Sequence, residues 1–552
     1  MSVYEKNLDK NKANFVPLTP LTFLKRAKDI YPNYEAIIYE DRKYSWIEVY
    51  KRCVKFASAL TKIGIKKGDT VSFLAFNTPE IFEAHYSVPM TGAVLNTINI
   101  RLDAKTISYI LEHSEAKVLV VDRQLHIEVK KALSSINRKI TIIDINDKFA
   151  DQSKLDKIGE LEYEKFLDTG DENYNWQMPD DEWQALSLSY TSGTTGNPKG
   201  VMLSHGGILS NCEGAEEILQ SLIKKDPPVF LTWLPLSHSY EHTVQYVQIL
   251  LGAKVFYAES LEKLLPNVAI AKPTIMTAVP RFYQNLYTKI SLNFSKQKGM
   301  KKYFITNSIL LGTKILNKEP LSIKKKFINF ICEILVRRKI RKQFGGKLRA
   351  FVSGGGALDQ KTGEFLNSIG LPTLQGYGLT EASPVVSCNI PGKIRIETVG
   401  PPFKTNKVKI AEDGEILVKG ENVMLGYWNM KKETDEIIKD GWLHTGDIGE
   451  ITKEGNLKIT DRKKDIIVNL GGDNISPTKI ENLLSLNEKI KQSLVYGDKK
   501  TYLVALIVTD IYENEKEIQL YIEKLNNNLS IIEKIKKFKL IKEEFTIENG
   551  ML

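Results

Sequence analysis

The chain has 552 residues, of which 42% are hydrophobic and 26% charged, and its formal net charge is +10. This hydrophobic content excludes a largely disordered protein and supplies enough apolar surface for roughly two to four domains. A basic chain favours polyanionic partners such as nucleotides, nucleic acid or anionic lipid surfaces, but the charge alone does not choose among them.

The N-terminal segment and the cysteines bear on where the protein resides. Residues 1–15 are polar and mixed in charge, without the apolar core of a signal peptide, so we expect no targeting signal. No apolar run reaches the roughly 18 residues needed to span a bilayer. The four cysteines are scattered without a CxxC pair, which predicts reduced structural thiols and a cytoplasmic protein.

Across residues 45–145, short apolar runs alternate with amphipathic stretches. The runs Val71–Ala75 and Val118–Val121 predict buried strands, whereas Glu48–Ile63 and Ala104–His113 predict helices. Alternation of this kind indicates βα units and a largely parallel sheet covered by helices.

The rest of the chain changes character several times. Asn77-Thr78-Pro79 predicts the start of a helix, and the polar, acidic residues 147–182 predict surface structure before the α/β pattern resumes. After residue 400, short strands with turns, such as residues 414–418, predict a β-rich region. Beyond Lys464 the pattern returns to a small α/β unit.

Residues 189–200, SYTSGTTGNPKG, form a cluster of small and hydroxylated residues that ends near a lysine. Small residues let the backbone approach a ligand, hydroxyl and N–H groups can hold phosphate oxygens, and Lys199 adds a positive charge. The Gly and Lys spacing differs from that of a Walker A loop. Taken alone, the cluster is also compatible with a flexible surface loop.

This cluster resembles the phosphate-binding loop of the adenylate-forming (AMP-binding) superfamily, and four further family motifs follow in order. Residues 352–357 (VSGGGA) resemble the adenine-side loop, and residues 375–381 (QGYGLTE) resemble the YGxTE motif. Residues 442–447 (WLHTGD) resemble the ribose-binding segment, and residues 461–465 (DRKKD) resemble the hinge. The resemblance covers nearly the whole chain and points to long-chain fatty acid:CoA ligases, the acyl-CoA synthetases.

The resemblance implies an α/β fold with two domains. Residues 1–460 would form a large N-terminal domain with parallel-sheet α/β subdomains and a β-rich subdomain, and residues 461–552 a small, mobile α+β C-terminal domain. It also implies ATP-dependent activation of a long- or medium-chain fatty acid to acyl-AMP, followed by transfer to coenzyme A. Such transfer requires a hinge closure of the small domain.

The resemblance assigns roles at the ATP site. Because a carboxylate must attack the α-phosphorus of ATP, charge neutralisation and positioning dominate the barrier. Thr380 and Glu381 match the catalytic residues at the α-phosphate and Mg²⁺, and a carboxylate suits this hard cation. The residues that would contact the phosphates and the adenine side are Thr191, Ser192, Gly193, Thr194, Thr195, Gly196, the catalytic Lys199, Gly355, Gly356, Ala357, Gln375, Gly376, Tyr377 and Gly378.

Further roles follow in the C-terminal motifs. Asp447 would accept hydrogen bonds from the ribose hydroxyls, Arg462 would contact the ribose, and Lys464 would be the hinge residue. Gly471 and Gly472 match the loop that approaches the pantetheine arm of coenzyme A. An aspartate after glycine, or a glycine pair, can instead be part of an ordinary turn.

Residues 234–238 (LPLSH) resemble the acyl-site motif of fatty acyl-CoA synthetases, in which the catalytic His238 would lie near the carboxylate. The alternative is a satisfied core histidine. No amine-binding aspartate is apparent, which argues against an aminoacyl substrate. Residues 238–242 also match the HxxEH metalloprotease pattern, but Pro235 and the other motifs argue against zinc.

Residues 296–349 carry sixteen lysines and arginines against Glu319 and Glu333 only. Apolar positions at helical spacing (Ile323, Phe327, Phe330, Ile331 and Ile334) predict a helix that lies on an anionic membrane and receives fatty acid from it. The alternative is a solvated basic face packed on the body of the protein. Nucleic acid is not an expected partner, because aromatic stacking platforms are missing from the segment.

One departure from the family concerns its C-terminal catalytic lysine, which follows a segment similar to Phe545–Leu552 in long-chain relatives. No residue of this sequence matches that lysine. The sequence is then either a truncated copy of an active ligase or a natural variant with weak adenylation. A non-catalytic acyl- or nucleotide-binding protein, and transfer of the acyl group to a carrier protein, are the functional alternatives.

Overall fold

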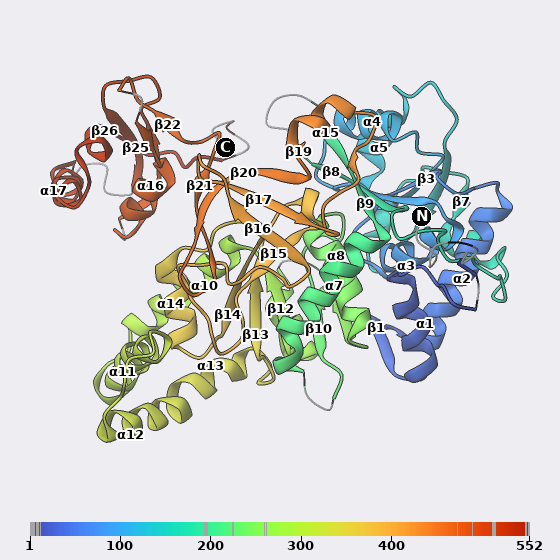
Figure 1. The fold of residues 1–552 in the computed structure, drawn as a ribbon. Coiled ribbons are helices and arrows are strands. Elements are labelled where there is room, and N and C mark those ends of the chain that lie inside the picture. Colours follow the sequence, from blue (N-terminus) through green and yellow to red (C-terminus); the bar gives the residue numbers. More distant parts are fainter. Residues whose placement is uncertain are drawn as a thin grey trace.

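The computed structural model describes residues 6, 10–11, 13–191, 197–223, 226–258, 260, 262–471, 473–487, 489–509, 515–546 and 549. Figure 1 shows helices on both sides of two large sheets, a separate β-rich layer beside them and a small C-terminal domain to one side. The predicted α/β class, with parallel-sheet subdomains, a β-rich subdomain and a small C-terminal domain, is confirmed.

One eight-stranded sheet has the order β18-β9-β8-β4-β3-β5-β6-β7 within the described residues. Strands β4, β3, β5, β6 and β7 are parallel, as expected for βα units, and β8 pairs antiparallel with β9. The strands are β3 (Thr70–Leu74), β4 (Val94–Thr97), β5 (Val118–Asp122), β6 (Thr141–Ile145), β7 (Leu161–Glu162), β8 (Ala185–Thr191), β9 (Lys199–Ser204) and β18 (Gly426–Tyr427). The associated helices are α2 (Trp46–Lys62), α3 (Pro79–Ser87), α4 (Ala104–His113), α5 (His126–Leu133) and α6 (Tyr163–Asp168).

The second eight-stranded sheet has the order β15-β14-β13-β12-β10-β11-β1-β2, with antiparallel pairs only at its two edges. Its strands are β1 (Glu35–Tyr39), β2 (Arg42–Ser45), β10 (Val229–Thr232), β11 (Lys254–Tyr257), β12 (Ile275–Ala278), β13 (Ala350–Ser353), β14 (Thr373–Gly378) and β15 (Val385–Cys388). The associated helices are α1 (Leu21–Ile30), α7 (His205–Leu219), α8 (Ser239–Leu250), α9 (Leu264–Ala271), α10 (Pro280–Ser295) and α14 (Gln360–Ser368).

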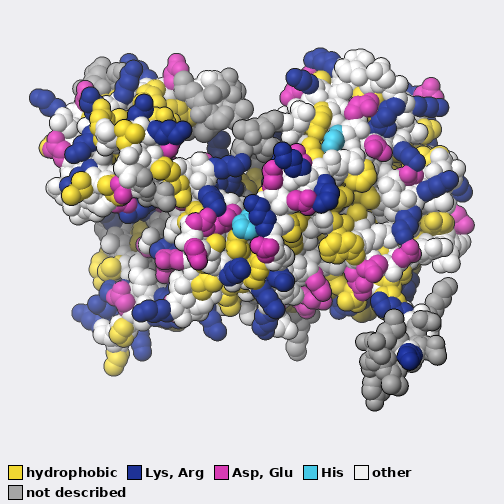
Figure 2. All heavy atoms as spheres, turned by 45° about the horizontal axis from the view of Figure 1, so that its top comes forward, with side chains coloured by type: hydrophobic (Ala, Val, Ile, Leu, Met, Phe, Trp, Pro, Cys, Tyr) yellow, Lys and Arg dark blue, Asp and Glu magenta, His cyan; other side chains and the backbone are white. Residues whose placement is uncertain are grey.

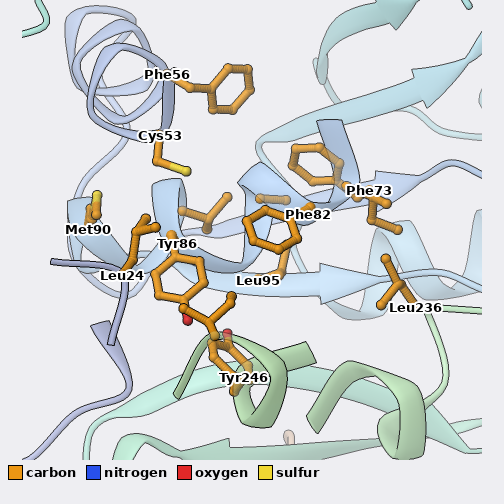
Figure 3. Packing of buried hydrophobic residues seen from close by; sticks show 14 of the residues in the cluster. Leu24, Cys53, Phe56, Phe73, Phe82, Tyr86, Met90, Leu95, Leu236 and Tyr246 are labelled. Carbon is orange, nitrogen blue, oxygen red and sulfur yellow. The ribbon is translucent and has the colours of Figure 1, made fainter. Parts of the chain in front are cut away.

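The largest apolar core joins the two sheets through helix α3, which is buried on every side. In Figure 3, Phe82 and Tyr86 of α3 lie between Phe56 of α2 and Tyr246 of α8. The rings of Tyr86 and Tyr246 are 5.6 Å apart. The helix also buries charge: its Glu80 accepts a hydrogen bond from Arg42 over 2.6 Å, as buried carboxylates require a partner.

The β-rich layer follows residue 400, where the sequence predicts it. It contains β16 (Asn406–Ile410), β17 (Glu415–Gly420), β19 (Ile438–Lys439), β20 (Trp442–Ile451), β21 (Leu457–Arg462) and helix α15 (Lys431–Ile437). The C-terminal domain contains β22 (Ile467–Val468), β23 (Asn474–Ile475), α16 (Pro477–Ser485), β24 (Ile490–Tyr496), β25 (Leu503–Thr509), α17 (Glu515–Asn526) and β26 (Ile535–Ile541) around a core of its own. The domain boundary between residues 460 and 461 stays a prediction, and β21 runs across it.

The basic segment folds as a helical hairpin that projects from the second sheet (Figure 1). It consists of α11 (Gly299–Leu316), α12 (Ile323–Cys332) and a π-helical turn (Glu333–Arg337), and α13 (Arg338–Gln343) leads back to β13. Among the described residues, no helix is both long enough and apolar enough to cross a bilayer.

Candidate active site

The hairpin of β8 and β9 positions the expected phosphate loop. Thr191, the last residue of β8, pairs with Lys199, the first residue of β9, and Tyr190 pairs with Gly200. Both ends of the loop are therefore held by two hydrogen-bonded neighbouring strands of the first sheet. Ser192, Gly193, Thr194, Thr195 and Gly196 lie outside the described residues, so their contacts with phosphate stay predictions.

Lys199 and Glu381 come together through a residue that the motif analysis did not select, Tyr427 of β18. The Lys199 ammonium lies 4.8 Å from the centre of the Tyr427 ring, a cation–π contact. The Tyr427 hydroxyl donates a 2.7 Å hydrogen bond to Glu381 Oε1. Burial and the neighbouring Glu381 raise the pKa of Tyr427, so the phenol stays protonated and remains a donor.

Thr380 is the first residue of a short 3₁₀ turn, Thr380–Ala382, which shortly precedes strand β15. Its hydroxyl lies 2.9 Å from the hydroxyl of Ser239, the first residue of α8. The turn therefore contacts two separate parts of the site. Glu381 faces the phosphate hairpin through Tyr427, and Thr380 faces the start of α8, where His238 lies.

His238 is the N-cap residue of α8, and its Nδ1 accepts a hydrogen bond from the Tyr240 amide at 3.3 Å. The neutral ring therefore carries its proton on Nε2, which is left to donate to a ligand. The side chain is exposed to solvent and is not a core histidine, but surrounding protein atoms lower the pKa of His238. A lowered pKa favours the neutral form of the ring.

In the glycine loop after β13, the first glycine is closely packed and the following residues are exposed to solvent. A Cβ on Gly354 would lie 2.8 Å from the ring of Tyr240, whose hydroxyl donates to the Val352 carbonyl. Gly355 has a φ of +75°, in the left-handed region that favours glycine. The residues Gly355, Gly356 and Ala357 are all exposed, so their backbone is accessible to a ligand.

Strand β14 contains Gln375, Gly376, Tyr377 and Gly378, and it lies next to β13, which leads into the glycine loop. A Cβ on Gly378 would collide with the backbone carbonyl of Pro384, so a side chain is excluded there. This close approach brings the end of β14 against the segment after the Thr380 turn.

Asp447 lies in β20 and pairs with Arg462 of β21 in the sheet register. Its Oδ2 accepts a 2.6 Å hydrogen bond from the Tyr377 hydroxyl, and its Oδ1 lies 3.2 Å from Arg462 Nε. The Asp447 side chain is 8% exposed and that of Arg462 is 70% exposed. Burial raises the pKa of Asp447, although Tyr377 and Arg462 oppose this shift.

The hinge expected at residues 461–465 stays a prediction; its Lys464 lies in an exposed turn after β21. The neighbouring Lys463 Nζ contacts Asp413 at 2.6 Å and Glu415 at 2.9 Å. The buried Glu415 also accepts hydrogen bonds from His444 and from the Gly446 amide. Glu415 was missed from the sequence, where a single acid in a short strand carries no signal of its own.

The expected pantetheine loop is described only in part. Gly471 lies in the turn after β22, where a Cβ would be 3.2 Å from the side chains of Asn469 and Asp473. Gly472 lies outside the described residues, so its assignment stays a prediction.

The HxxEH match has no metal-site geometry. His238 is exposed at the start of α8, whereas His242 is buried and stacks on His85 with ring centres 4.1 Å apart. Among the residues with assigned positions, no group of three or more His, Cys, Asp or Glu side chains is placed to hold a metal ion.

Comparison with known families identifies the chain. A family profile described as "AMP-binding enzyme" matches residues 24–428, and one described as "AMP-binding enzyme C-terminal domain" matches residues 464–545. The chain belongs to the AMP-binding enzyme family.

This AMP-binding enzyme has relatives with varied substrates. It is 30% identical over 522 residues to long-chain-fatty-acid–CoA ligase FadD15 of Mycobacterium bovis. The match covers 90% of this chain and 86% of that protein. It is 31% identical to acetate–CoA ligase CCL3 of Humulus lupulus, over 88% of this chain and 83% of the relative. It is 32% identical to a peroxisomal benzoate–CoA ligase of Arabidopsis thaliana, over 88% of this chain and 80% of the relative.

Solved structures confirm the fold of this AMP-binding enzyme. The anthranilate CoA ligase AuaEII in complex with anthranoyl-AMP matches with a TM-score of 0.75 at 19% identity, over 97% of this chain and 95% of that one. The o-succinylbenzoate CoA synthetase MenE of Bacillus subtilis, bound to the intermediate OSB-AMP, matches with a TM-score of 0.72 at 22% identity, over 94% of each chain.

Proposed function

We propose that this chain is an AMP-forming acid–CoA ligase whose acid is a long- or medium-chain fatty acid. In the first step a carboxylate oxygen attacks the α-phosphorus of ATP, the bond to pyrophosphate breaks, and acyl-AMP forms. In the second step the thiol sulfur of coenzyme A attacks the acyl carbonyl carbon, the bond to AMP breaks, and acyl-CoA forms.

The observation that carries the proposal is the turn Thr380–Ala382, where separate motifs meet. Glu381 reaches the phosphate hairpin through Tyr427 and Lys199, and Thr380 contacts Ser239 next to His238. The phosphate motif and the acyl motif therefore converge on two consecutive residues. A phosphate on one side of this turn and a carboxylate on the other would be bound by consecutive residues, as attack on the phosphorus requires.

Each residue has a defined task in this proposal. Lys199 would neutralise charge on the outer phosphates, and the Thr380 hydroxyl would donate to an oxygen of the α-phosphate. Neutral His238 would donate Nε2–H to the substrate carboxylate, which orients the nucleophile without forming an ion pair with it. Asp447, buried beside the exposed Arg462, would accept hydrogen bonds from the ribose hydroxyls.

The residues present fit Mg²⁺ bound with ATP. Glu381 offers a carboxylate and Thr380 a hydroxyl, which are hard oxygen ligands, and Mg²⁺ commonly takes its remaining ligands from water and phosphate. When bound, the ion supplies Lewis-acid neutralisation of the phosphate charge. A MenE structure in complex with ATP and a magnesium ion shares the fold of this chain, with a TM-score of 0.71.

A fatty acid is favoured over other acids by two observations. Residues 339–351 resemble the segment that precedes the glycine loop in long-chain enzymes, and FadD15 is named for that substrate. An apolar cluster also extends from Trp233 and Phe282, near the start of the site, to Phe304 and Ile309 of α11. In this proposal these apolar side chains would contact the hydrocarbon chain of the substrate.

The test measures ATP–pyrophosphate exchange with palmitate, octanoate, acetate and benzoate, and then acyl-CoA formation. We expect exchange with palmitate or octanoate to exceed that with acetate or benzoate by at least about tenfold, because each buried CH₂ contributes about 0.8 kcal/mol. Preference for acetate or benzoate would overturn the fatty-acid assignment and leave the ligase class standing.

The carrier-protein alternative uses the same first step. It would be favoured if exchange occurs but the acyl group passes to a phosphopantetheinyl carrier and not to free coenzyme A. Folded protein that binds ATP without exchange on any acid would favour the acyl- or nucleotide-binding alternative and overturn the ligase proposal.

A further inference from the structure

The helical hairpin formed by α11, α12 and the π-helical turn, residues 299–337, exposes large apolar side chains. On α12, Ile323, Phe327 and Phe330 are 88%, 65% and 61% exposed, and Met300 and Leu310 of α11 are also more than half exposed. At 100° per residue the three α12 positions share one face of the helix. A contiguous apolar stripe on a projecting element marks an interaction surface more often than chance exposure.

The hairpin is firmly held on its opposite side, so this exposure is not a sign of loose packing. Ser308, Leu311 and Gly312 of α11 are buried, and a Cβ on Gly312 would collide with the backbone of α14. Arg337, 5% exposed, donates to the carbonyls of Ser368 and Ser308, each at 2.8 Å. These bonds tie the hairpin to α14 and fix which face points outward.

Lysines flank the apolar stripe. Lys324, Lys325 and Lys326 follow Ile323 on α12, and Lys301 and Lys302 lie at the start of α11, all of them exposed. Across the described part of the chain, these five lysines form no ion pair within 4 Å. In Figure 2, dark-blue and yellow side chains intermingle at the lower left, the side on which Figure 1 places α11 and α12.

We propose that this hairpin docks on an anionic lipid bilayer, with Ile323, Phe327 and Phe330 inserted at the headgroup boundary and the lysines contacting anionic headgroups. Charge complementarity selects this occupant: an apolar stripe bordered by unpaired cations matches a surface that is negative outside and apolar beneath. A protein partner would need acidic residues around an apolar groove, and a second copy of this hairpin would bring like charges together.

The hairpin shares an apolar cluster with the segment that precedes the candidate acyl motif. Phe304 and Ile309 of α11 belong to the same apolar cluster as Trp233 and Phe282. In this proposal a fatty acid leaves the bilayer along the apolar side of the hairpin. This consequence rests on the proposed function, whereas the docking itself does not, because vesicle binding is measured without any substrate.

The main test is sedimentation of the full chain with vesicles of phosphatidylcholine alone or with about 30% phosphatidylserine. We expect binding only to the anionic vesicles. Near an anionic surface each lysine strengthens binding about fivefold, so Lys324→Gln/Lys325→Gln/Lys326→Gln should weaken it about a hundredfold. The triple variant Ile323→Ser/Phe327→Ser/Phe330→Ser should weaken binding more than tenfold.

Matched controls separate this surface from general stickiness. Ile270→Ser/Leu520→Ser/Ile531→Ser changes side chains that are 68%, 66% and 82% exposed elsewhere. Lys453→Gln/Lys499→Gln/Lys500→Gln removes the same charge away from the hairpin. Both controls should bind anionic vesicles like the wild type, and hairpin variants that also bind like the wild type would overturn the proposal.

A second measurement does not depend on loss of binding. All four native cysteines are buried, so Ile323→Cys can be labelled selectively with an environment-sensitive dye. Anionic vesicles should shift the dye emission to the blue. An unchanged spectrum, or a shift that depends on protein concentration without lipid, would overturn the proposal, and the latter would identify a second copy of the chain as the occupant.

Discussion

At the scale of single residues, Tyr427 is the side chain that turns separate motifs into one site. It stacks under Lys199 and donates to Glu381, so it holds a cation and a candidate metal ligand in fixed relation. Neither contact could be predicted from the sequence, because β18 is only two residues long and has no periodicity.

Tyr427→Phe isolates the hydrogen bond, since it keeps the ring beneath Lys199. A hydrogen bond to a charged group contributes roughly 1.5–3 kcal/mol, so we expect acid-dependent pyrophosphate exchange to fall at least about tenfold. Tyr521→Phe removes a 2.7 Å hydrogen bond to Leu483 in the C-terminal domain and is the control. An equal loss in both variants would mean that the effect is one of stability alone.

Asp447 presents a second residue-scale case, in which function and stability oppose each other. Burial raises its pKa, so the folded state binds the proton more tightly than the unfolded chain, and the charged form costs stability at neutral pH. Asp447→Asn removes this cost. We expect a higher Tm than the wild type at pH 7, with the difference shrinking as the pH falls toward the ordinary range of aspartate.

The same variant should bind ATP less well, because an amide matches two ribose hydroxyls less completely than a carboxylate does. We expect the KM for ATP in the exchange reaction to rise at least about tenfold. Calorimetry across pH and steady-state exchange kinetics check the two halves. A lower Tm at pH 7 would show that the contacts with Tyr377 and Arg462 outweigh the burial of charge.

At the scale of elements, amphipathic helices and the buried strands β3 and β5 were predictable from the sequence, whereas the extent of a helix buried on every side was not. The predicted helix Ala104–His113 coincides with α4, and a helix does begin at Pro79. The extent of α3 stayed hidden because burial on every side removes the amphipathic period. The acidic stretch 147–182, expected to be surface structure, contains α6, whose Tyr163 and Phe166 enter the core.

The sequence likewise predicted only part of the candidate active site. The family resemblance assigned both Asp447 and Arg462 to the ribose, and the register of β20 and β21 places the two residues opposite each other. The motifs could not reveal the contacts among Thr380, Ser239 and Tyr427, because these depend on how α8 and β18 pack.

The π-helical turn after α12 gives the element-scale prediction. It directs Arg337 inward, where it bridges α11, α12 and α14. Arg337→Met would leave buried carbonyls without donors, so we expect a loss of about 2–4 kcal/mol and faster tryptic cleavage within residues 299–337. The adjacent, exposed Arg338→Met is the matched control. Equal protease resistance in both variants would show that apolar packing alone holds the hairpin.

At the scale of the whole molecule, the C-terminal domain has an apolar core separate from the large core that joins the two sheets. The C-terminal domain packs around Ile507 and Ile518, and its link to the β-rich layer includes the Thr478 hydroxyl, which donates to Asp461, and the Lys463 ion pairs. Apolar surface binds domains together more strongly than exposed ion pairs do. This arrangement supports the predicted mobility of the small domain.

Two cores joined in this way predict two transitions in calorimetry. Ile507→Ala truncates a fully buried side chain and should cost about 2–5 kcal/mol, which lowers the C-terminal transition by at least about 8 °C and leaves the other in place. Val120→Ala, in the first parallel sheet, should do the reverse. If both variants shift a single transition, the domains unfold as one unit, and the predicted swing of the small domain would have to break more contacts than the polar link supplies.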